Sequence, residues 1–405
     1  MKIKTIRWID LNVGKMLCFL LTLWRSLMRL ILPSKPPPPQ RILFIKFIEQ
    51  GASVLAYSAI QRAIEQVGAQ NVYFCLFRPN RPILDIMDLL PSENILEIRD
   101  DRLLHFFSDS AKALWRCRHL KIDSTIDMEL FSRASAIFAY LSGARNRVGL
   151  HRYTSELAYR GRLMTHEIQY NPYLHIATAY LLLVESLFLP TTQVPMSKLD
   201  PTTLQTEVPK FRYKAADLEA FGQKLKREAG RPLASQLVLL NPNASDMLPL
   251  RKWETERFIH LGKQLLERHD DLLIVITGAP SEAEIADQIA ARYDSPRVFS
   301  MAGRTSMREL FLLYEWSDLL VTNDSGPAHF ASMTDTSIIV LFGPETPQLY
   351  GPLGSRVRVI WKALTCSPCV NAVNHRFSPC TNNVCMQGIE VDEVLTICEE
   401  ELKRS

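Results

Sequence analysis

The sequence predicts an α/β protein with two doubly wound domains. Its 405 residues exceed the roughly 150 of an average domain, and its 47% apolar and 22% charged content supports a full core. This composition excludes disorder, collagen and coiled coil. Short apolar runs alternate with helical patterns, an order that gives parallel sheets covered on both faces. A polar, proline-containing stretch at about 190–210 interrupts the alternation, so we expect a ligand-binding cleft between two domains.

Charge separates the N-terminus from the rest of the chain. Residues 1–41 carry eight Lys or Arg and one acid, Asp10, whereas the remainder has 39 basic and 42 acidic residues. A general nucleic-acid surface is therefore disfavoured. Eight cysteines are too few for a disulfide scaffold and favour a location inside the cell.

The segment from Leu11 to Leu32 predicts an amphipathic helix. Its longest charge-free run, 16–24, is nine residues, short of the roughly 20 needed to cross a bilayer. At 100° per residue, polar side chains share one narrow face and apolar ones the opposite side. The polar group is Asn12, Lys15, Thr22, Ser26 and Arg29, with Arg25 beside it, and the apolar group is Leu17, Leu20, Leu23, Trp24, Leu27 and Ile31.

We expect this helix to lie on an anionic membrane surface, with residues 1–35 as the contact. Two alternatives are a helix docked on the protein's own body and a signal peptide. The signal peptide is disfavoured because no small-x-small cleavage site follows and Arg25 and Arg29 interrupt the apolar run. Residues 36–39 are all proline and form a stiff spacer.

The remaining elements follow in order along the chain. In the first half we expect strands at 42–48, 71–77, 95–98 and 124–130, and helices at 54–67, 103–118 and 132–142. In the second half we expect strands at 237–242, 272–278, 298–303, 318–324 and 337–343, and helices at 254–268, 281–292 and 306–316. The predicted parts are 1–40, 41–205, 206–388 and a C-terminal segment 389–405, whose helix at 391–402 is expected to pack back across both domains.

The stretch DLLVTNDSGPAHFASM, residues 318–333, carries the strongest functional signal. A buried strand ends at Asp324, a turn follows at Ser325 and Gly326, and Pro327 suits the first position of a helix. Gly326 lets a ligand approach the backbone, and the free amides favour phosphate or pyrophosphate. His329 could add a donor. The alternative is that Asp324 or Ser325 only caps a helix and His329 is an interior side chain.

Two further strand ends should reach the same site. Asn243, Ala244 and Ser245 follow one strand, and Arg251 and Lys252 precede the next helix, where cations can neutralise a leaving diphosphate. Gly278 ends another strand. Glu282 and Glu284 follow it and are candidates for binding ribose hydroxyls, or they are first-turn acids that favour the helix dipole.

VTNDSGPAHFAS and IIVLFGPETPQLYGPLG (338–354) resemble the C-terminal signature of glycosyltransferase family 9, the heptosyltransferase-like enzymes. The resemblance extends over NPNAS, TGAP, the Cys-containing tail and, more weakly, GARNRVGL (143–150). It implies a GT-B architecture of two Rossmann-like domains facing a central cleft. It also implies sugar transfer from a nucleotide diphosphate donor to a lipopolysaccharide-type acceptor, with inversion, without metal and without another cofactor.

By the same resemblance, residues of the motif segments would bind the donor. Lys252 would pair with a phosphate and assist catalysis. The donor-binding set is Asn243, Ser245, Lys252, Gly278, Glu282, Glu284, Asp324, Ser325, Gly326, Pro327 and His329. A metal-free mechanism agrees with the absence of any Asp-x-Asp in the sequence.

One position departs from the family pattern. An Asp usually follows the glycine of the first strand–turn–helix, where it serves as base, but Ala52 follows Gly51 here. Our hypothesis is that Glu49 replaces it as the catalytic base; the alternative is a surface loop acid. The departure leaves open a second function, that of a nucleotide-sugar-binding scaffold at the membrane.

Two remaining groups have open roles. Basic residues of the N-terminal domain would favour an anionic glycolipid acceptor: Arg78, Arg81, Arg145, Arg147, His151 and Arg152. Cys366, Cys369, Cys380 and Cys385 allow a zinc site, disulfides or neither. The sequence as a whole predicts a glycosyltransferase, peripheral on the inner face of the cytoplasmic membrane, that builds a lipid-linked glycan.

Overall fold

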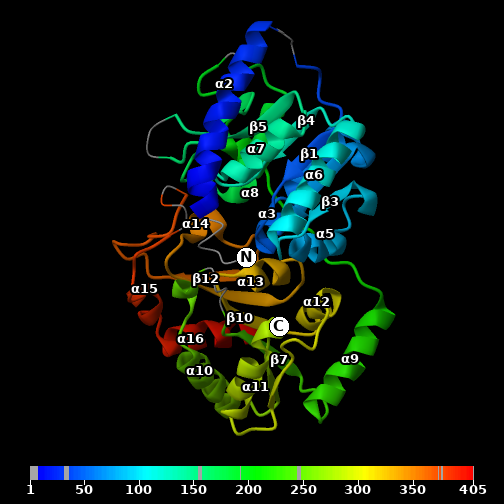
Figure 1. Ribbon diagram of the computed structural model, residues 1–405. Coiled ribbons are helices and arrows are strands. Elements are labelled where there is room, and N and C mark those ends of the chain that lie inside the picture. Colours follow the sequence, from blue (N-terminus) through cyan, green and yellow to red (C-terminus); the bar gives the residue numbers. More distant parts are fainter. Residues whose placement is uncertain are drawn as a thin grey trace. The chain divides into compact units, whose positions relative to one another are not determined.

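The computed structural model describes residues 8–31, 36–153, 157–191, 193–243, 248–372, 374 and 377–404. The chain divides into two compact units (Figure 1). Unit 1 comprises Met1–Glu207 and Ala372–Arg376, and unit 2 comprises Val208–Asn371 and Phe377–Ser405. The main division, between Glu207 and Val208, lies inside the polar stretch in which the sequence predicts a domain boundary.

Unit 1 contains a parallel sheet of six strands in the order β3-β2-β1-β4-β5-β6. The central strands are almost fully buried because helices cover both faces, which explains their continuous apolar runs. The strands are β1 (Ile42–Ile45), β2 (Val72–Phe77), β3 (Ile95–Ile98), β4 (Ser124–Asp127), β5 (Asn146–His151) and β6 (His166–Gln169).

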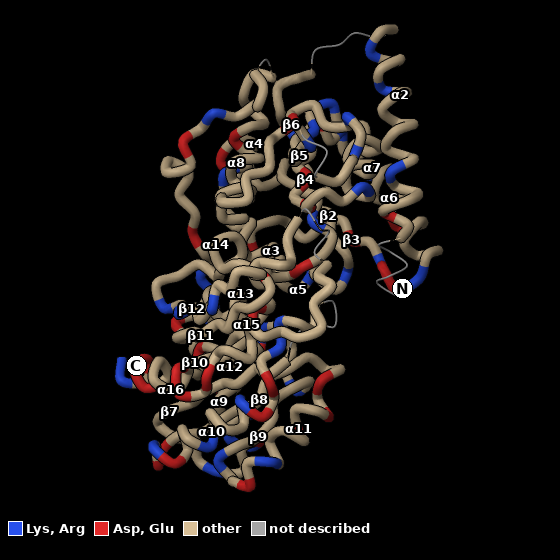
Figure 2. Tube along the Cα trace, turned by 90° about the vertical axis from the view of Figure 1, so that its left-hand side faces the viewer, with Lys and Arg blue, Asp and Glu red and all other residues tan. Residues whose placement is uncertain are grey.

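Helices form a layer on each face of this sheet. In one layer, α2 (Lys15–Ile31), α6 (Leu103–His119) and α7 (Arg133–Leu141) bury side chains in a core shared with β1 and β2. On the other face, α4 (Tyr57–Val67) packs against α8 (Ile176–Leu187), which also contacts β5. Figures 1 and 2 both show α2, α7 and α6 in the same layer. The shorter α3 (Gln50–Leu55) and α5 (Arg81–Met87) pack against each other.

Two strands of unit 1 end earlier than their apolar patterns predict. The strand expected at 42–48 ends at Ile45, because the backbone amides of Phe47 and Ile48 donate to Oε1 of Glu129 at 2.7 and 3.2 Å. The strand expected at 124–130 ends at Asp127, whose Oδ1 accepts from the amide of Glu129 at 3.0 Å. Side chains therefore replace part of the ladder at the carboxyl ends of both strands, while the carbonyl of Phe47 still accepts from the amide of Phe77 at 3.0 Å.

Unit 2 repeats the same topology, in the order β12-β11-β10-β7-β8-β9. Its strands are β7 (Gln236–Asn241), β8 (Leu272–Ile276), β9 (Val298–Ser300), β10 (Leu319–Asn323), β11 (Ser337–Phe342) and β12 (Val357–Trp361). Its helices are α9 (Ala215–Ala229), α10 (Thr255–Arg268), α11 (Ala283–Ala291), α12 (Met307–Glu315), α13 (Gly326–Ala331), α14 (Pro347–Tyr350), α15 (Val384–Gln387) and α16 (Val391–Leu402).

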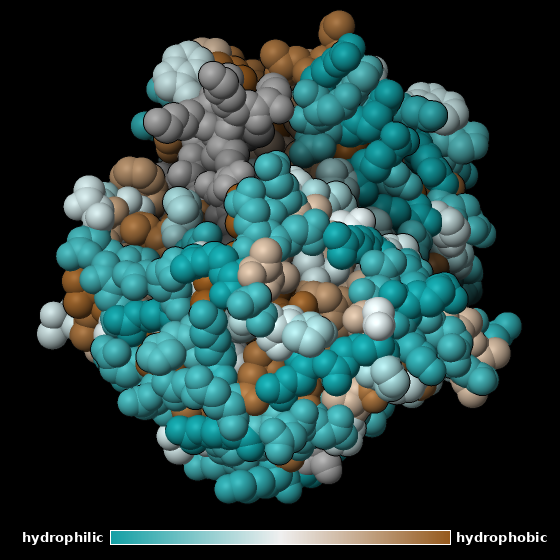
Figure 3. All heavy atoms as spheres, turned by 90° about the horizontal axis from the view of Figure 1, so that it is seen from below, coloured by the Kyte–Doolittle hydropathy of each residue, from teal (hydrophilic) through white to brown (hydrophobic). Residues whose placement is uncertain are grey.

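The core of unit 2 lies between its sheet and the helices α10, α11 and α16. The C-terminal helix α16 packs against α10 and buries Val394, Leu395 and Cys398 in this core, so it is part of unit 2. Its predicted packing across both domains stays a prediction. The face seen in Figure 3 is mostly hydrophilic, in keeping with the charged outer sides of α10 and α11.

Both sheets have the strand order of a doubly wound fold, which reverses direction at the pair β1–β4 in unit 1 and β7–β10 in unit 2. Ligands of such folds bind outside the carboxyl ends of the strands at this point of reversal. The residues that follow β1 and β4 in unit 1, and β7 and β10 in unit 2, are therefore the candidates for ligand binding.

The N-terminal helix α2 docks on unit 1 through its small and polar residues. Cys18 is fully buried, and the guanidinium of Arg25 donates to the carbonyl of Arg162. Oγ1 of Thr22 accepts from the amide of Arg162 at 3.0 Å. The β-carbon that Gly161 lacks would lie 2.3 Å from Thr22 Oγ1, so only glycine permits this approach.

The apolar side of α2 points away from unit 1. Leu20, Leu23, Trp24 and Leu27 are about half exposed, and Leu30 is 82% exposed. The docking alternative is thus correct for the side of the helix that carries Cys18, Leu21 and Arg25. Lys15, Ser26 and Arg29 of the predicted polar face are exposed, as are the leucines named above. Within the described residues, no helix is long and apolar enough to span a membrane.

Candidate functional site

The predicted donor site is built on the carboxyl ends of β7, β8, β10 and β11, which are neighbours in the sheet of unit 2. Parallel strands present their carboxyl ends at one edge, so segments far apart in sequence meet there. Asn243 follows β7, Gly278 follows β8, Asp324 follows β10 and Glu345 follows β11. The sequence predicted the first three of these and missed Glu345.

Asn323 joins the two central segments. Its Nδ2 donates to the carbonyl of Asn243 at 3.1 Å, and its Oδ1 accepts from the amide of Trp253 at 2.9 Å. Asn323 is fully buried, so these two bonds replace the hydrogen bonds to water that its side-chain amide loses on folding. The Asn323 side chain thereby fixes the start of the 243–253 segment and its end.

Arg251 lies against two buried carboxylates. Its Nε is 3.3 Å from Oδ2 of Asp324, and its guanidinium also donates to Glu345. Asp324 is 4% exposed and Glu345 1% exposed, so the cluster is shielded from solvent. Arg251 was predicted to face a leaving diphosphate, and in the structure these two acids already engage it.

The acids outnumber the cation in this cluster, and their pKa values reflect it. Burial raises the pKa of Glu345 to about 8, opposed by Arg251 and reinforced by the charge of Asp324. Burial also raises the pKa of Asp324, again opposed by Arg251. Within the described part of the chain, Oδ2 of Asp324 has no hydrogen-bond donor.

Gly278 lies where the backbone passes close to Asn243. A β-carbon at this position would lie 2.8 Å from Asn243 Nδ2 and 3.1 Å from Glu282 Oε2. Glu282 Oε2 accepts from the amide of Ala279 at 2.7 Å, so this carboxylate closes its own turn. Glu284 is exposed in the first turn of α11. The predicted ribose role of these two acids stays a prediction.

The turn into α13 follows the sequence prediction closely. Pro327 lies in the first turn, and Ser325 occupies the capping position without making a side-chain capping bond. Its Oγ instead donates to the carbonyl of Asn323 at 3.1 Å. His329 is buried, at 8% exposure. Because α13 has only six residues, its dipole is small, and an anion at Gly326 would depend on individual amides and nearby cations.

Lys252 follows the 3₁₀ turn Pro249–Arg251 and is partly exposed. It forms no ion pair with a described residue, in contrast to Arg251. Its carbonyl accepts from Asn383 Nδ2 at 3.1 Å, which ties the segment to the Cys-containing tail. Ser245, which the sequence places beside this site, lies outside the described residues.

The equivalent edge of unit 1 carries a second charged cluster. Lys46, after β1, lies 3.2 Å from Glu49 and 3.1 Å from Glu129, which follows β4. Lys46 is 2% exposed and Glu129 8%, but Glu49 is 24% exposed. Glu49 has a φ of 73°, which is unusual for a residue with a side chain. Glu49 is predicted from the sequence, whereas its two partners are not.

Asp127, at the end of β4, is also buried and paired. Its Oδ2 lies 2.8 Å from Arg160 and accepts from Ser135 Oγ at 2.9 Å. The acidic spacing of Asp127 and Glu129 directly after an apolar run is the signal that could have identified this edge of the sheet.

The Cys-containing tail shows no metal site among the described residues, where no three metal-ligating side chains come together. Cys366, Cys369, Cys380 and Cys385 are free thiols. Ser378 donates to Cys369 at 3.2 Å, and Cys380 donates to the carbonyl of Asn382 at 3.1 Å. The zinc alternative stays a prediction.

Solved structures of similar fold include E. coli ADP-heptose lipopolysaccharide heptosyltransferase II. It aligns with a TM-score of 0.66 and 16% identity over 90% of this chain and 99% of that chain. A second, an E. coli heptosyltransferase solved with ADP, aligns with a TM-score of 0.58 and 15% identity over 89% and 99%. At these identities the likeness shows the fold, and that fold is GT-B, two Rossmann-like domains.

The family is decided by the sequence. The model of glycosyltransferase family 9 (heptosyltransferase) matches residues 114–377, more than half of the chain. The chain belongs to glycosyltransferase family 9. Among curated relatives, lipopolysaccharide heptosyltransferase 2 of Salmonella typhimurium is 30% identical over 115 residues, 28% of this family 9 chain and 32% of the relative. This chain covers about a third to a half of the length of the first curated relatives.

Proposed function

We propose that this family 9 protein is an inverting, metal-independent glycosyltransferase. It transfers a heptose-like sugar from a nucleotide diphosphate donor to a lipopolysaccharide-type, lipid-linked acceptor. One observation carries the proposal: Asn323, Asp324 and Arg251 form a buried polar cluster at the point where the strand order of unit 2 reverses. Family membership supplies the reaction class, and the ADP bound to the similar E. coli enzyme supports an adenine nucleotide.

In this proposal the donor lies along the carboxyl edge of unit 2. Asp324, which directly follows β10 at this edge, accepts from a sugar or ribose hydroxyl. Lys252 neutralises the diphosphate as it leaves, because its ammonium has no acid partner within the described residues. Asn243, Ser245, Gly278, Glu282, Glu284, Ser325, Gly326, Pro327 and His329 complete the donor site.

Arg251 has a different role from Lys252. Glu345 and Asp324 already engage its guanidinium, so it is not free to pair with a phosphate. Arg251 therefore orients the Asp324 carboxylate and makes little contribution to the charge that meets the phosphates. It is a positioning residue, and Lys252 is the catalytic cation.

Glu49 is the proposed base that takes the proton of the acceptor hydroxyl as the anomeric carbon is attacked. Its carboxylate is the most exposed member of the Lys46–Glu49–Glu129 cluster, and Lys46 holds it in place at 3.2 Å. The positive φ of Glu49 is consistent with a functional constraint on this turn. Glu129 is buried and bonded to two amides, which leaves it less suited to proton transfer.

The test is a donor screen followed by a transfer assay. Saturating ADP-heptose should raise the unfolding temperature, since a ligand at 100 times its Kd adds about 2.7 kcal/mol to stability. Glu49→Gln should keep this shift and lose transfer by about 100-fold or more. Glu65→Gln, an exposed acid of the same unit, is the control. Unchanged transfer in Glu49→Gln would remove Glu49 from the mechanism, and no shift with any nucleotide sugar would contradict the proposed function.

A nucleotide-sugar-binding scaffold is the second candidate, favoured by Ala52 in the position where the family usually has its base. It predicts the same donor-induced shift in the wild type but no transfer with any acceptor. The shift and the transfer assay together therefore separate the two functions.

We also propose that the protein acts at the inner face of the cytoplasmic membrane, with the exposed side of α2 in contact with lipid. This side carries Leu20, Leu23, Trp24 and Leu27, and α2 has basic but no acidic residues (Figure 2). In the same helix layer, α6 exposes Leu104, Phe107 and Trp115. The helices α2 and α6, which both pack against α7 in this layer, thus each expose apolar side chains.

Co-sedimentation with anionic vesicles tests this contact. Leu23→Ser/Leu27→Ser should lower the bound fraction strongly, because each buried leucine contributes about 1.5–3 kcal/mol. Val194→Ser/Leu199→Ser, exposed apolar residues of unit 1 outside α2, serve as the matched control. Equal binding of the two double variants would contradict a role for α2.

A further inference from the structure

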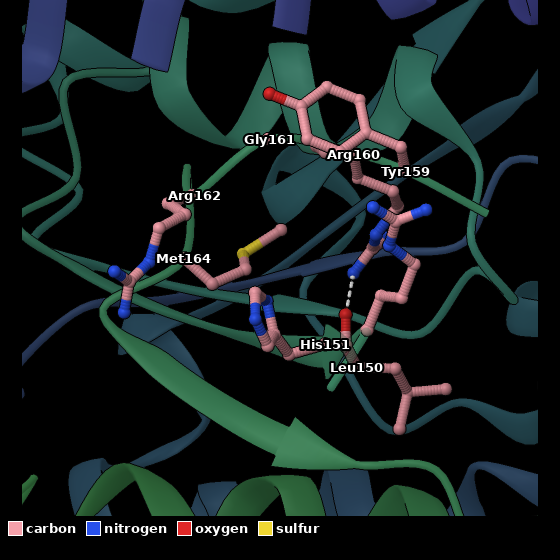
Figure 4. Close-up of a pocket in the computed structure, with 9 residues that line it drawn as sticks. Leu150, His151, Tyr159, Arg160, Gly161, Arg162 and Met164 are labelled. Atoms are coloured by element: carbon pink, nitrogen blue, oxygen red, sulfur yellow. Dashed lines mark hydrogen bonds between the residues drawn. The ribbon is translucent and has the colours of Figure 1, made fainter. Parts of the chain in front are cut away.

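Unit 1 contains a pocket beside the docked helix α2. The pocket has a volume of about 310 Å³ and is lined by residues of α7, of the end of β5 and of the segment that leads to β6. Its polar lining residues are His151, Arg152, Tyr159, Arg160 and Arg162. In Figure 4 the side chains of Arg160 and Arg162 lie on opposite sides of His151, with the Tyr159 ring across from it.

The three arginines of this pocket differ in how far their charge is compensated. Arg160 is buried, pairs with Asp127 at 2.8 Å and donates to the carbonyl of Leu150. Arg162 is 74% exposed and forms a longer ion pair with Glu167 at 3.6 Å, an acid that also lies 3.6 Å from His151. Arg152 forms no ion pair with a described residue, and its guanidinium stacks over the ring of Tyr159, 5.3 Å from the centroid. Arg152 and Arg162 therefore carry most of the available positive charge.

His151 adds a hydrogen-bonding group without adding charge. Burial lowers its pKa, the nearby arginines lower it further, and Glu167 opposes them, so the ring is neutral at physiological pH. A neutral imidazole has one donor and one acceptor nitrogen. Together with two guanidinium groups and the Tyr159 hydroxyl, this makes a donor-rich pocket that suits a phosphate or carboxylate.

The pocket is joined directly to α2. Gly161, between the pocket residues Arg160 and Arg162, is the residue that α2 approaches, and both the amide and the carbonyl of Arg162 bond to the helix. The segment that carries the pocket arginines is therefore held against the docked side of α2, whose other side exposes its apolar residues. Four of the other basic residues considered from the sequence lie outside the pocket lining: Arg78, Arg81, Arg145 and Arg147.

We propose that this pocket binds the anionic headgroup, phosphate or carboxylate, of a lipid held in the membrane on which α2 lies. The inference rests on the proposed function, for which it would place the charged part of the lipid-linked acceptor. Arg152 and Arg162 form charge-assisted hydrogen bonds to the anion, and His151 and Tyr159 donate to its remaining oxygens. Arg160 is a positioning residue, because Asp127 and Leu150 fix it.

The experiment measures binding of the full chain to phosphatidylcholine vesicles with and without phosphatidic acid. The wild type should prefer vesicles that contain phosphatidic acid. Arg152→Gln/Arg162→Gln should lose at least about tenfold of that preference, since bonds to charged groups are the strong ones. The control Arg102→Gln/Lys121→Gln removes the same charge from exposed positions of unit 1 outside the pocket. It should lose clearly less.

Three readouts make the result decisive. Equal losses in the two double variants would overturn the proposal in favour of general surface attraction. Inorganic phosphate should stabilise the wild type only weakly. A different result would overturn the lipid assignment in favour of a free anion. In that result, inorganic phosphate stabilises the wild type but not the pocket variant, and the pocket variant keeps its preference for vesicles with phosphatidic acid. Arg162→Gln alone, at a largely exposed position, checks that lost binding does not come from misfolding.

The donor-induced shift reports the proposed function separately, because the pocket residues all belong to unit 1 and the donor residues to unit 2. The pocket variants should keep that shift at its wild-type size. Its absence in the wild type would count against the glycosyltransferase alone.

Discussion

The backbone amide of Trp253 donates to Oδ1 of Asn323, 70 residues further along the chain, at a distance of 2.9 Å. The same Asn323 side chain donates to the carbonyl of Asn243. One amide group thus holds together both ends of the segment that carries Arg251 and Lys252. The position of Lys252, the proposed catalytic cation, therefore depends on a residue that is itself too buried to touch a substrate.

Asn323→Ala should therefore affect stability and function together. The variant leaves the buried Trp253 amide and Asn243 carbonyl without partners, at about 1–3 kcal/mol each. We expect a loss of about 2–5 kcal/mol in the free energy of unfolding and a weaker donor-induced shift. Chemical denaturation measures the first and a thermal-shift titration the second. Asn382→Ala, at an exposed site of the same unit, should change neither by more than about 0.5 kcal/mol.

Lys252→Gln tests the proposed catalytic cation. Removing a group that stabilises developing charge lowers turnover by about 100- to 1,000-fold, with a smaller effect on donor affinity. Steady-state kinetics with ADP-heptose separate the two effects. Lys263→Gln, an exposed lysine on α10, is the matched control and should retain wild-type turnover. A loss confined to KM would show that Lys252 binds substrate and transition state equally well.

The buried Glu345 predicts a specific dependence of stability on pH. Its pKa is raised from 4.5 to about 8 by burial, so the folded state binds more protons than the unfolded state between these values. The contribution of Glu345 to stability is therefore present below about pH 4.5 and is lost as pH rises toward 8. Denaturation of the wild type at pH 5 and pH 8 should show a decline that Glu345→Gln reduces by at least about 1.4 kcal/mol, the equivalent of one pKa unit. An identical decline in the variant would assign the pH dependence to other groups.

Gly161→Ala tests the seat of α2. The new β-carbon would lie 2.3 Å from Thr22 Oγ1 and 2.6 Å from the carbonyl oxygen of Cys18, so α2 must move. We expect destabilisation of about 2–4 kcal/mol and faster proteolysis within α2. Gly230→Ala is the control, because Gly230 has a similar φ of 63° and no neighbour within 4 Å. The difference in destabilisation between the two variants separates the effect of the clash from that of backbone strain. Equal destabilisation would mean that α2 is not tightly packed against Gly161.

The sequence predicted most of the buried strands because parallel strands covered on both faces are continuous apolar runs. The three strands that were not predicted contain charged or ionisable side chains. β5 has Arg147 and His151, β6 has His166 and Glu167, and the edge strand β12 has Arg358. The helix expected at 54–67 proved to be α4 preceded by α3, with a break at Ala56, whose amide is shared between the carbonyls of Ala52 and Ser53.

Some residues of the candidate site could likewise be predicted from the sequence and others could not. Asn243, Gly278 and Asp324 could be identified because each directly follows a recognisable strand, and strand ends of a parallel sheet meet at one edge. Glu345 and Glu129 could not be assigned, because their partners depend on which strands are neighbours. Strand order is a property of the folded sheet, which the local pattern does not encode.

The docking of α2 against the segment at Gly161 and Arg162 has a consequence for the synthesis of the protein on the ribosome. The helix bonds to Arg162 through Thr22, and these two residues are 140 positions apart. At roughly 5–20 residues per second, a ribosome needs on the order of ten seconds or more to add that stretch. During that interval the nascent helix lacks its contact with Gly161, and Cys18 is not yet buried. A leucine-rich segment that is synthesised well before its intramolecular partner is available to a bilayer, or to a chaperone, while the rest of unit 1 is still being made.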